Sequence, residues 1–194
     1  MHRHKTIDLL QRYVPEDPVE LRDKQIMLEV LACEPYCFER SCLEGHFTAS
    51  CWFENCKGNA ALLTHHKKFG DWLQLGGHAD GDSDLRRVSL KEAFEELGVS
   101  ALEFVQSEIF DIGVHFIPPF EDVPEHYHYD VRFYVRAIKD EDFVVSEESY
   151  ALKWVFLDEE ESLPNNYALK RMFAKWKNLK SGKLWDLASK QDVS

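Results

Sequence analysis

Apolar residues recur at helical spacing in two segments near the start of the chain. They lie three or four positions apart within residues 5–13 and within residues 18–33, and Pro15 and Pro18 interrupt the pattern between the segments. The pattern predicts two amphipathic helices, which together form a helical N-terminal extension over residues 1–40.

Short β-prone runs and two further helical patterns fill the rest of the chain. Strands are expected at residues 47–53, 59–64, 72–75, 101–112, 127–138 and 150–157. Apolar spacing also predicts a helix over residues 84–97, closed by Gly98 as a left-handed cap, and an amphipathic C-terminal helix over residues 165–180. This mixture predicts an α/β fold, an α/β/α sandwich around a mixed sheet, with residues 1–194 forming a single domain.

The composition is that of an ordinary globular protein with an excess of acidic residues. Hydrophobic residues make up 44% of the chain and charged residues 30%, and the formal net charge is −12. Non-specific binding to nucleic acid or to an anionic membrane needs a basic patch, so this charge argues against both kinds of partner. No apolar run approaches the roughly 18–20 residues that cross a bilayer, and the start of the chain does not resemble a signal peptide. We therefore expect a cytoplasmic protein.

All five cysteines lie between positions 33 and 56. Their number is odd, and no two of them form the closely spaced Cys-x-x-Cys pair that is typical of structural zinc sites. Reduced thiols without a special role are therefore favoured over a zinc site.

Three glutamates share one side of the helix predicted over residues 84–97. Glu92, Glu95 and Glu96 stand at positions i, i+3 and i+4, which places their carboxylates within about 100° of the helix circumference. A solvated glutamate face on a surface helix is the plain alternative. Here, however, a pair of glycines precedes the helix at the end of a strand, and another glycine closes it. Carboxylates framed in this way favour a site for hard divalent cations, which prefer carboxylate oxygens.

Residues 77–99 resemble the Nudix box, whose pattern is G-x5-E-x7-R-E-U-x-E-E-x-G-U with U a bulky aliphatic residue. The specified positions are occupied here by Gly77, Ser83, Lys91, Glu92, Ala93, Glu95, Glu96, Gly98 and Val99. Both glycines, the three helix glutamates and the final valine match the pattern. Lysine replaces arginine, a small alanine replaces the bulky residue, and serine replaces the first glutamate. The likeness extends over roughly residues 40–160, so this part of the chain is similar to Nudix hydrolases.

The resemblance implies a divalent cation site on the helix, for Mg²⁺ or Mn²⁺. In the family the cations are held by glutamates at the positions of Glu92, Glu95 and Glu96, together with the main-chain carbonyl before the first glycine of the box, here that of Gly76. Lys91 would orient Glu92 in place of the usual arginine, without its bidentate fork.

The resemblance also implies a Nudix-type pyrophosphohydrolase, which cleaves a phosphoanhydride bond in a small molecule linked to a nucleoside diphosphate. A water activated by the cations would attack one phosphorus in line. Glu92, Glu95 or the loop residue Glu148 would accept its proton, and the sequence does not choose among them. Glu147 is an equal candidate beside Glu148, and an acidic loop without a role is the plain alternative. No motif selects a particular substrate, and the oligomeric state is equally open.

Polar residues alternate along one of the later predicted strands. His126, His128, Asp130 and Arg132 therefore share one face of the sheet, which is either a solvated outer face or a polar floor beneath the substrate. We prefer the second interpretation, because charges buried without partners are costly and should face water, metal or ligand. His78 directly follows the glycine pair and is expected at the border of the same site, although an ordinary loop histidine is the alternative. We therefore predict that His78, His128, Asp130 and Arg132 bind the substrate.

Two other classes of function remain open. A Nudix-fold sensor that binds a nucleotide without catalysis is compatible with the departures at Ser83 and Lys91, although the intact helix glutamates argue against it. A plain α/β interaction protein with an accidental likeness is disfavoured, because the matching positions are joined in one continuous pattern. An enzyme is the function that we predict.

Overall fold

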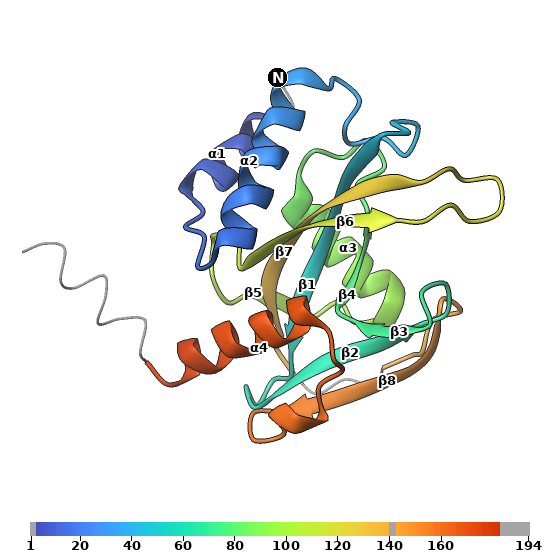
Figure 1. Ribbon diagram of the computed structural model, residues 1–194. Helices are drawn as coiled ribbons and strands as arrows, with labels where there is room; N and C mark the ends of the chain where they lie inside the picture. Colours follow the sequence, from blue (N-terminus) through green and yellow to red (C-terminus); the bar gives the residue numbers. More distant parts are fainter. Residues whose placement is uncertain (1–2, 140–142, 183–194) are drawn as a thin grey trace, which may run out of the picture.

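A mixed sheet organises the chain, with helices against both of its faces (Figure 1). The computed structural model describes residues 3–139 and 143–182, and eight strands of this part form the sheet. In chain order the elements are α1 (His4–Arg12), α2 (Pro18–Cys33), β1 (Gly45–Glu54), β2 (Ala60–His66), β3 (Asp71–Leu73), β4 (Leu75–His78), α3 (Leu85–Leu97), β5 (Leu102–Phe104), β6 (Asp111–Ile117), β7 (His126–Ala137), β8 (Ser149–Phe156), the 3₁₀ turn η1 (Glu160–Ser162) and α4 (Tyr167–Lys180). The predicted α/β fold around a mixed sheet is confirmed.

The long strands β1 and β7 form the centre of the sheet and run parallel to each other. Their register extends from Gly45 opposite Tyr127 to Glu54 opposite Arg136. β1 also pairs antiparallel with β2 and β4, β7 pairs antiparallel with β5 and β6, and β2 pairs antiparallel with β3 and β8. The two central strands therefore bring side chains that are about eighty positions apart in the chain into direct register.

Different helices cover the two faces of the sheet, because side chains alternate along each strand. Phe47 and Phe53 of β1 lie in one buried cluster with Leu97 of α3. Trp52 points to the opposite face, where it packs edge-on against Trp176 of α4 with ring centroids 5.8 Å apart. The sheet is therefore held between α3 and α4, as in the expected sandwich (Figure 1).

Local signals fix the ends of the helices. The Asp17 side chain caps α2 by accepting a hydrogen bond from the N–H of Glu20 at 2.8 Å, and Asn166 caps α4 by accepting one from the N–H of Leu169 at 3.2 Å. Gly98 ends α3 in the left-handed region, with a φ of 72°. The N-terminal pair, the middle helix and the C-terminal helix therefore form close to their predicted positions. None of the helices in residues 3–139 and 143–182 is long and apolar enough to cross a membrane.

Two predicted strands are wrong. The segment over residues 72–75 is divided at Gln74 between β3, which pairs with β2, and β4, which pairs with β1. The segment over residues 101–112 contains β5 and the start of β6 instead of a single strand. Between them the chain leaves the sheet over residues 105–110, although the N–H groups of Val105 and Phe110 still donate to β7 carbonyls. Ile109 and Phe110 are buried without belonging to a strand. The apolar pattern thus continues through the turn and does not show where the first strand ends.

The predicted single domain over residues 1–194 stays a prediction. Residues 1–2, 140–142 and 183–194 lie outside the described residues. Within the described part, one buried cluster joins side chains of the N-terminal helices, such as Leu10 and Met27, to the sheet and α3. This shared core favours one domain.

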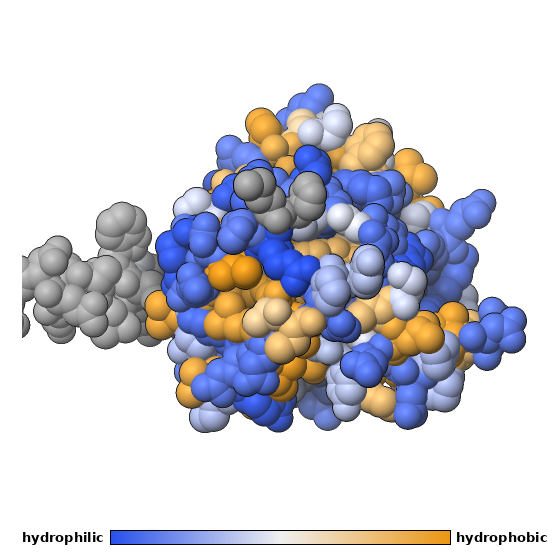
Figure 2. Space-filling view, turned by 90° about the horizontal axis from the view of Figure 1, so that it is seen from above, coloured by the Kyte–Doolittle hydropathy of each residue, from blue (hydrophilic) through white to orange (hydrophobic). Residues whose placement is uncertain are grey.

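The surface of the molecule is mixed in polarity. Figure 2, which views the molecule from above, shows hydrophobic side chains in several separate groups among hydrophilic ones. Apolar atoms make up roughly 55–60% of the surface of any folded protein, so groups of this kind do not by themselves indicate a binding site.

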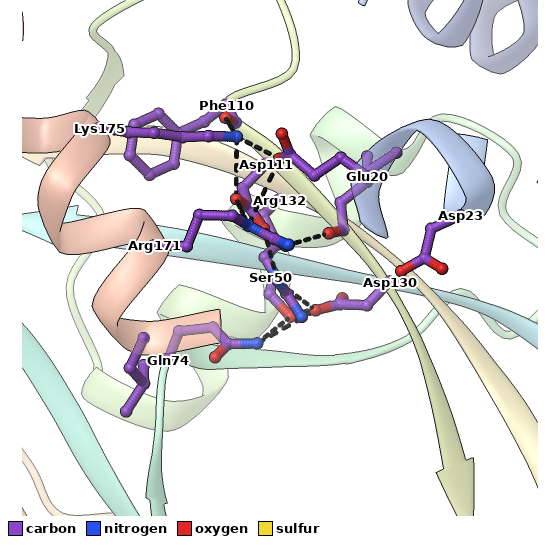
Figure 3. A network of polar contacts seen from close by, with 12 residues as sticks. Glu20, Asp23, Ser50, Gln74, Phe110, Asp111, Asp130, Arg132, Arg171 and Lys175 are labelled. Atoms are coloured by element: carbon purple, nitrogen blue, oxygen red, sulfur yellow. Dashed lines mark hydrogen bonds and ion pairs between the residues drawn. The ribbon is translucent and has the colours of Figure 1, made fainter. Parts of the chain in front are cut away.

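A buried polar network on the α4 side of the sheet joins α2 to α4 through β6 and β7 (Figure 3). At its centre, the fully buried Asp111 of β6 accepts hydrogen bonds from Arg132 of β7 at 2.5 Å and from Arg171 of α4 at 2.8 Å. Lys175 of α4 lies 3.0 Å from the same carboxylate and also pairs with Glu20 of α2. Burial by itself raises the pKa of Asp111, but these three cations outweigh burial and hold the pKa well below its ordinary value.

Helix α2 joins this network from the edge of the sheet. Glu20 is fully buried and binds both the Tyr13 hydroxyl and Lys175. One turn further along, the Asp23 carboxylate accepts a hydrogen bond from the N–H of Val114 in β6 at 3.0 Å. The helix therefore satisfies main-chain groups at a strand edge that would otherwise be open to pairing with other chains.

We predict that Asp111→Asn lowers the free energy of unfolding by about 3–5 kcal/mol, because the neutral amide leaves two guanidinium groups and an ammonium group buried without full compensation. Urea unfolding near neutral pH measures the effect. Glu108→Gln is the matched control. Glu108 forms an exposed ion pair with Arg12 at 3.0 Å, so its loss should cost less than about 1 kcal/mol. An Asp111→Asn variant that is as stable as the control would contradict the structural role of the network.

Candidate active site

A pair of glycines lets β4 pass close to β1 just before α3 begins. A Cβ atom at Gly76 would meet the Cα of Ser50 in β1 at 2.6 Å, and Gly76 has a φ of 156°, which side chains rarely allow. A Cβ atom at Gly77 would lie only 2.2 Å from Oε2 of Glu92. The glycines therefore permit two close approaches, one between strands and one between the strand and the Glu92 carboxylate.

Lys91 holds the first two glutamates of the helix. Its Nζ atom lies 3.1 Å from Oε1 of Glu92 and 3.1 Å from Oε2 of Glu95. The Glu92 side chain is 14% exposed, whereas that of Glu95 is 53% exposed. Lys91 thus contacts both Glu92 and Glu95, and Glu95 lies at the outer edge of the group. That Lys91 orients Glu92 for catalysis stays a prediction.

Glu96 lies deepest among the three glutamates. Its carboxylate is buried and accepts a hydrogen bond from the N–H of Gly76 at 2.7 Å. Burial is the main cause that raises the pKa of Glu96 to about 8, and the neighbouring charges of Glu92 and Glu148 raise it further, against the hydrogen bond from Gly76. Burial also raises the pKa of Glu92. The helix therefore presents carboxylates whose negative charges are poorly compensated by the protein alone.

The loop before β8 brings a fourth carboxylate to this group. The charge of Glu148 acts on both Glu92 and Glu96 and raises the pKa of each. The loop is fixed next to the end of β2, where the N–H of Lys67 donates to the Glu148 carbonyl at 2.9 Å and the Lys67 ammonium group donates to the Glu147 carbonyl at 2.6 Å. Glu148 is therefore the acidic residue of this loop whose charge acts on both Glu92 and Glu96.

This arrangement fits hard divalent cations. Glu96 offers a carboxylate oxygen beside the main chain of Gly76, and Glu92 offers one beside Gly77. A nearby cation would favour the ionised forms of both and offset their mutual repulsion. Oxygen donors are those that Mg²⁺ and Mn²⁺ prefer.

The NUDIX domain family model matches residues 45–176, from the first residue of β1 into α4. The chain belongs to the Nudix family. The predicted family and its hydrolase class are thereby confirmed, and α3 is the Nudix helix of this chain. Helices α1 and α2 precede the matched range.

Solved structures of similar fold are Nudix hydrolases at low sequence identity. The Ap4A hydrolase of C. elegans, in a binary complex, is 16% identical, with 70% of this chain and 98% of that chain covered and a TM-score of 0.56. The MutT protein from Methanosarcina mazei Go1 is 19% identical, with 69% and 94% covered and a TM-score of 0.53. No curated protein gave a match. At these identities the likeness supports the fold of this Nudix domain and leaves its substrate open.

On the other side of β4 from Glu92, two of the predicted substrate-binding residues come together. The rings of His78 in β4 and His128 in β7 are 4.9 Å apart between centroids, and His46 of β1 lies 5.1 Å from His78 and 5.0 Å from His128. Burial, the main cause, lowers the pKa of His78 to about 3 and that of His128 to about 2. At neutral pH both imidazoles are therefore neutral and can each donate and accept one hydrogen bond.

Asp130 and Arg132 are buried instead of open to a pocket, with 4% and 1% of their surfaces exposed. Asp130 accepts hydrogen bonds from Ser50 at 2.7 Å, from Gln74 at 3.1 Å and from Arg132 at 2.7 Å, and Asp111 is the second partner of Arg132 (Figure 3). The expectation that these two charges face water, metal or ligand is wrong, because neighbouring elements supply partners that the alternating pattern does not reveal. Their assignment as substrate-binding residues stays a prediction.

Sequence reasoning missed the contribution of β1 to this polar face. His46 and Ser50 alternate with apolar residues in the same way as the polar positions of β7, and the parallel register sets His46 directly opposite His128. The alternation was readable in the sequence. The pairing of the two strands was not, because a parallel neighbour can lie anywhere along the chain.

We predict that Gly77→Ala lowers the affinity for Mn²⁺ by about tenfold or more, equivalent to about 1.4 kcal/mol, because the new methyl group must displace the Glu92 carboxylate. Electron paramagnetic resonance of free Mn²⁺ measures the affinity, and thermal melting checks the fold. Glu92→Gln alone and the variant that combines it with Gly77→Ala complete a double-mutant cycle. If Gly77 acts through Glu92, the alanine should have little further effect in the Glu92→Gln background. Equal losses in both backgrounds would contradict this coupling.

Proposed function

We propose that this Nudix hydrolase cleaves a phosphoanhydride bond in a small molecule built on a nucleoside diphosphate, with Mg²⁺ or Mn²⁺ as cofactor. The observation that carries the proposal is the group of carboxylates around the glycine pair. Glu96 binds the N–H of Gly76, Glu92 lies against Gly77, and both carboxylates have a raised pKa in the absence of cations. Such a group is chemically incomplete until positive charge is added.

Glu92, Glu96 and the carbonyl of Gly76 would hold the innermost cation, with Glu95 at the solvent side. When bound, the cations would neutralise the diphosphate and supply an activated water. The strongly acidic chain makes this neutralisation necessary, since a net charge of −12 repels phosphates. Lys91 would keep Glu92 and Glu95 aligned through its two ion pairs.

Three carboxylates remain candidates for accepting the proton of the attacking water. We favour Glu148 over Glu92 and Glu95, because the latter two already share the Lys91 ammonium group. Glu148 is exposed and acts electrostatically on both Glu92 and Glu96, so it is free to exchange protons with solvent while it stays close to the reacting group.

Substrate recognition is proposed for the polar face of β1, β4 and β7. Neutral His78 and His128 suit hydroxyl groups and phosphate oxygens. Asp130 and Arg132 would act from below, because Arg132 orients the Asp130 carboxylate and that carboxylate holds the side chains of Gln74 and Ser50. Such a substrate fits a cytoplasmic enzyme. In the cytoplasm the buried thiols of Cys37 and Cys51 would stay reduced. We propose neither nucleic acid nor a membrane as a partner.

The test is a hydrolysis screen over nucleoside diphosphate derivatives with Mg²⁺, with Mn²⁺ and with chelator. We predict turnover of at least one compound that requires the cation. Glu96→Gln should lower kcat by about a hundredfold or more, equivalent to about 2.7 kcal/mol of activation free energy. Glutamine keeps an acceptor for the N–H of Gly76, so the fold should survive.

Glu161→Gln, an exposed glutamate in η1, is the matched control and should leave turnover unchanged. Cation-independent turnover, or full activity in Glu96→Gln, would contradict the proposed site. Saturable binding of a nucleotide derivative without any turnover would instead identify a sensor.

A further inference from the structure

Four histidines gather on the polar face of the sheet at the starting end of its two parallel strands. His46 of β1 is opposite His128 of β7, and His78 of β4 is paired with Thr48 of β1, two positions further along the same face. His126 stacks on His46 with ring centroids 5.0 Å apart. Three strands that are remote in sequence therefore converge on one cluster of imidazoles.

Three of these rings are arranged as ligands of a single ion. In the part of the chain that the structure describes, His46, His78 and His128 each offer a ring nitrogen, and the three nitrogen atoms lie within 4.8 Å of one another. Three imidazoles at this separation can meet around one ion after small side-chain rotations, because metal–nitrogen bonds are about 2.0–2.1 Å long.

His46 provides an independent sign that a ligand is missing. Its ring is only 4% exposed, and its Nδ1 atom lies 3.3 Å from the carbonyl of Cys42. Its Nε2 atom is buried and has no hydrogen-bond partner among the described residues. A buried polar atom without a partner has lost its hydrogen bonds to water and gained none in return, so native structures seldom keep one unless something else binds it.

His126 acts as an outer partner of the group. Its Nδ1 atom lies 2.8 Å from the carbonyl of Pro124, which can only accept, so the proton is on Nδ1. In the neutral ring Nε2 then accepts, and it lies 3.1 Å from Nε2 of His128, which must donate. The other ring nitrogen of His128 is left with a free lone pair. Metal-binding histidines are commonly oriented by a second hydrogen bond of this kind.

We propose that His46, His78 and His128 bind one divalent transition-metal ion of the Zn²⁺ type, at a site separate from the carboxylates of α3. Imidazole ligands suit Zn²⁺, Co²⁺, Ni²⁺ and Cu²⁺, whereas Mg²⁺ prefers oxygen donors. Gly77 faces Glu92, and the next residue, His78, points to the opposite side of the strand, so the two sites lie on different faces of β4. Three protein ligands leave a coordination position open for water or a substrate oxygen.

An ion pair and one lysine act on the cluster. Arg40 acts on His78, but it is tied to Asp80 by two hydrogen bonds of 2.5 and 2.7 Å, and Asp80 acts on His78 in the opposite sense. Lys68 adds one further positive charge from the loop after β2. The Arg40–Asp80 pair is neutral as a whole, so a bound cation is opposed by the single positive charge of Lys68, and that charge would attract an anionic substrate to the open position.

The binding of this ion does not depend on the hydrolysis proposed above and is tested without turnover. Metal-free, reduced protein in saturating Mg²⁺, which occupies the carboxylate site, is titrated with Zn²⁺ by calorimetry and with Co²⁺ by visible absorption. We expect one Zn²⁺ per chain, and Co²⁺ bands without a thiolate charge-transfer band. X-ray absorption at the zinc edge of the parent protein should count three imidazole ligands.

Two single variants identify the ligands. His78→Gln and His128→Gln should each weaken Zn²⁺ binding by about a hundredfold or more, beyond the roughly 10–100-fold effect of losing an outer partner. His4→Gln, an exposed histidine in α1, is the matched control and should bind like the parent. Circular dichroism of the metal-free variants checks the fold. If a variant does not fold, the number of imidazole ligands that X-ray absorption gives for the parent protein tests the proposal.

Three results would overturn the proposal. They are the absence of saturable Zn²⁺ binding in the parent, undiminished binding in the two folded ligand variants, and a thiolate or carboxylate ligand set in the absorption spectra.

Discussion

The ion pairs of the buried Asp111 carboxylate hold the sheet and the C-terminal helix together. This carboxylate compensates Arg132 of the sheet and Arg171 and Lys175 of α4, all within one buried network (Figure 3). Each of these cations would be costly to bury alone, and the desolvated carboxylate would be costly without them. The central strands, the C-terminal helix and, through Glu20, the N-terminal helix α2 must therefore be in place together.

This constraint explains why the helices that precede the matched Nudix range are integral to the fold. The carboxylates of Glu20 and Asp23 reach into the sheet from α2, one to the Lys175 ammonium group and the other to the main chain of β6. Apolar side chains of the same helix, such as Met27 and Leu31, lie in the cluster that also backs α3. The Nudix helix thus rests on a core to which α2 contributes.

The sequence was sufficient to predict the elements that carry chemistry locally. The glycine pair, the three helix glutamates and the closing Gly98 lie within one short segment, so their spacing alone predicts the helix and its acidic side. Glu148 could also be named, although only the fold shows its charge acting on Glu92 and Glu96.

What the spacing could not show was burial. The alternation along β7 correctly grouped Asp130 with Arg132, but it carried no information on their partners, which are Ser50 of β1 and Gln74 for Asp130 and Asp111 of β6 for Arg132. Likewise His46 gains its neighbours only through the parallel pairing of β1 with β7, a contact between segments about eighty residues apart.

We propose that divalent cations bind to Glu92 and Glu96 of α3 beside the glycine pair. The most direct measurement is anomalous diffraction from crystals of the protein with Mn²⁺ and a non-hydrolysable nucleoside diphosphate analogue. We predict a Mn²⁺ peak coordinated by Glu92, Glu96 and the carbonyl of Gly76, with diphosphate oxygens completing the coordination. A bound analogue with Mn²⁺ held elsewhere, and with Glu96 still bonded only to the N–H of Gly76, would contradict it.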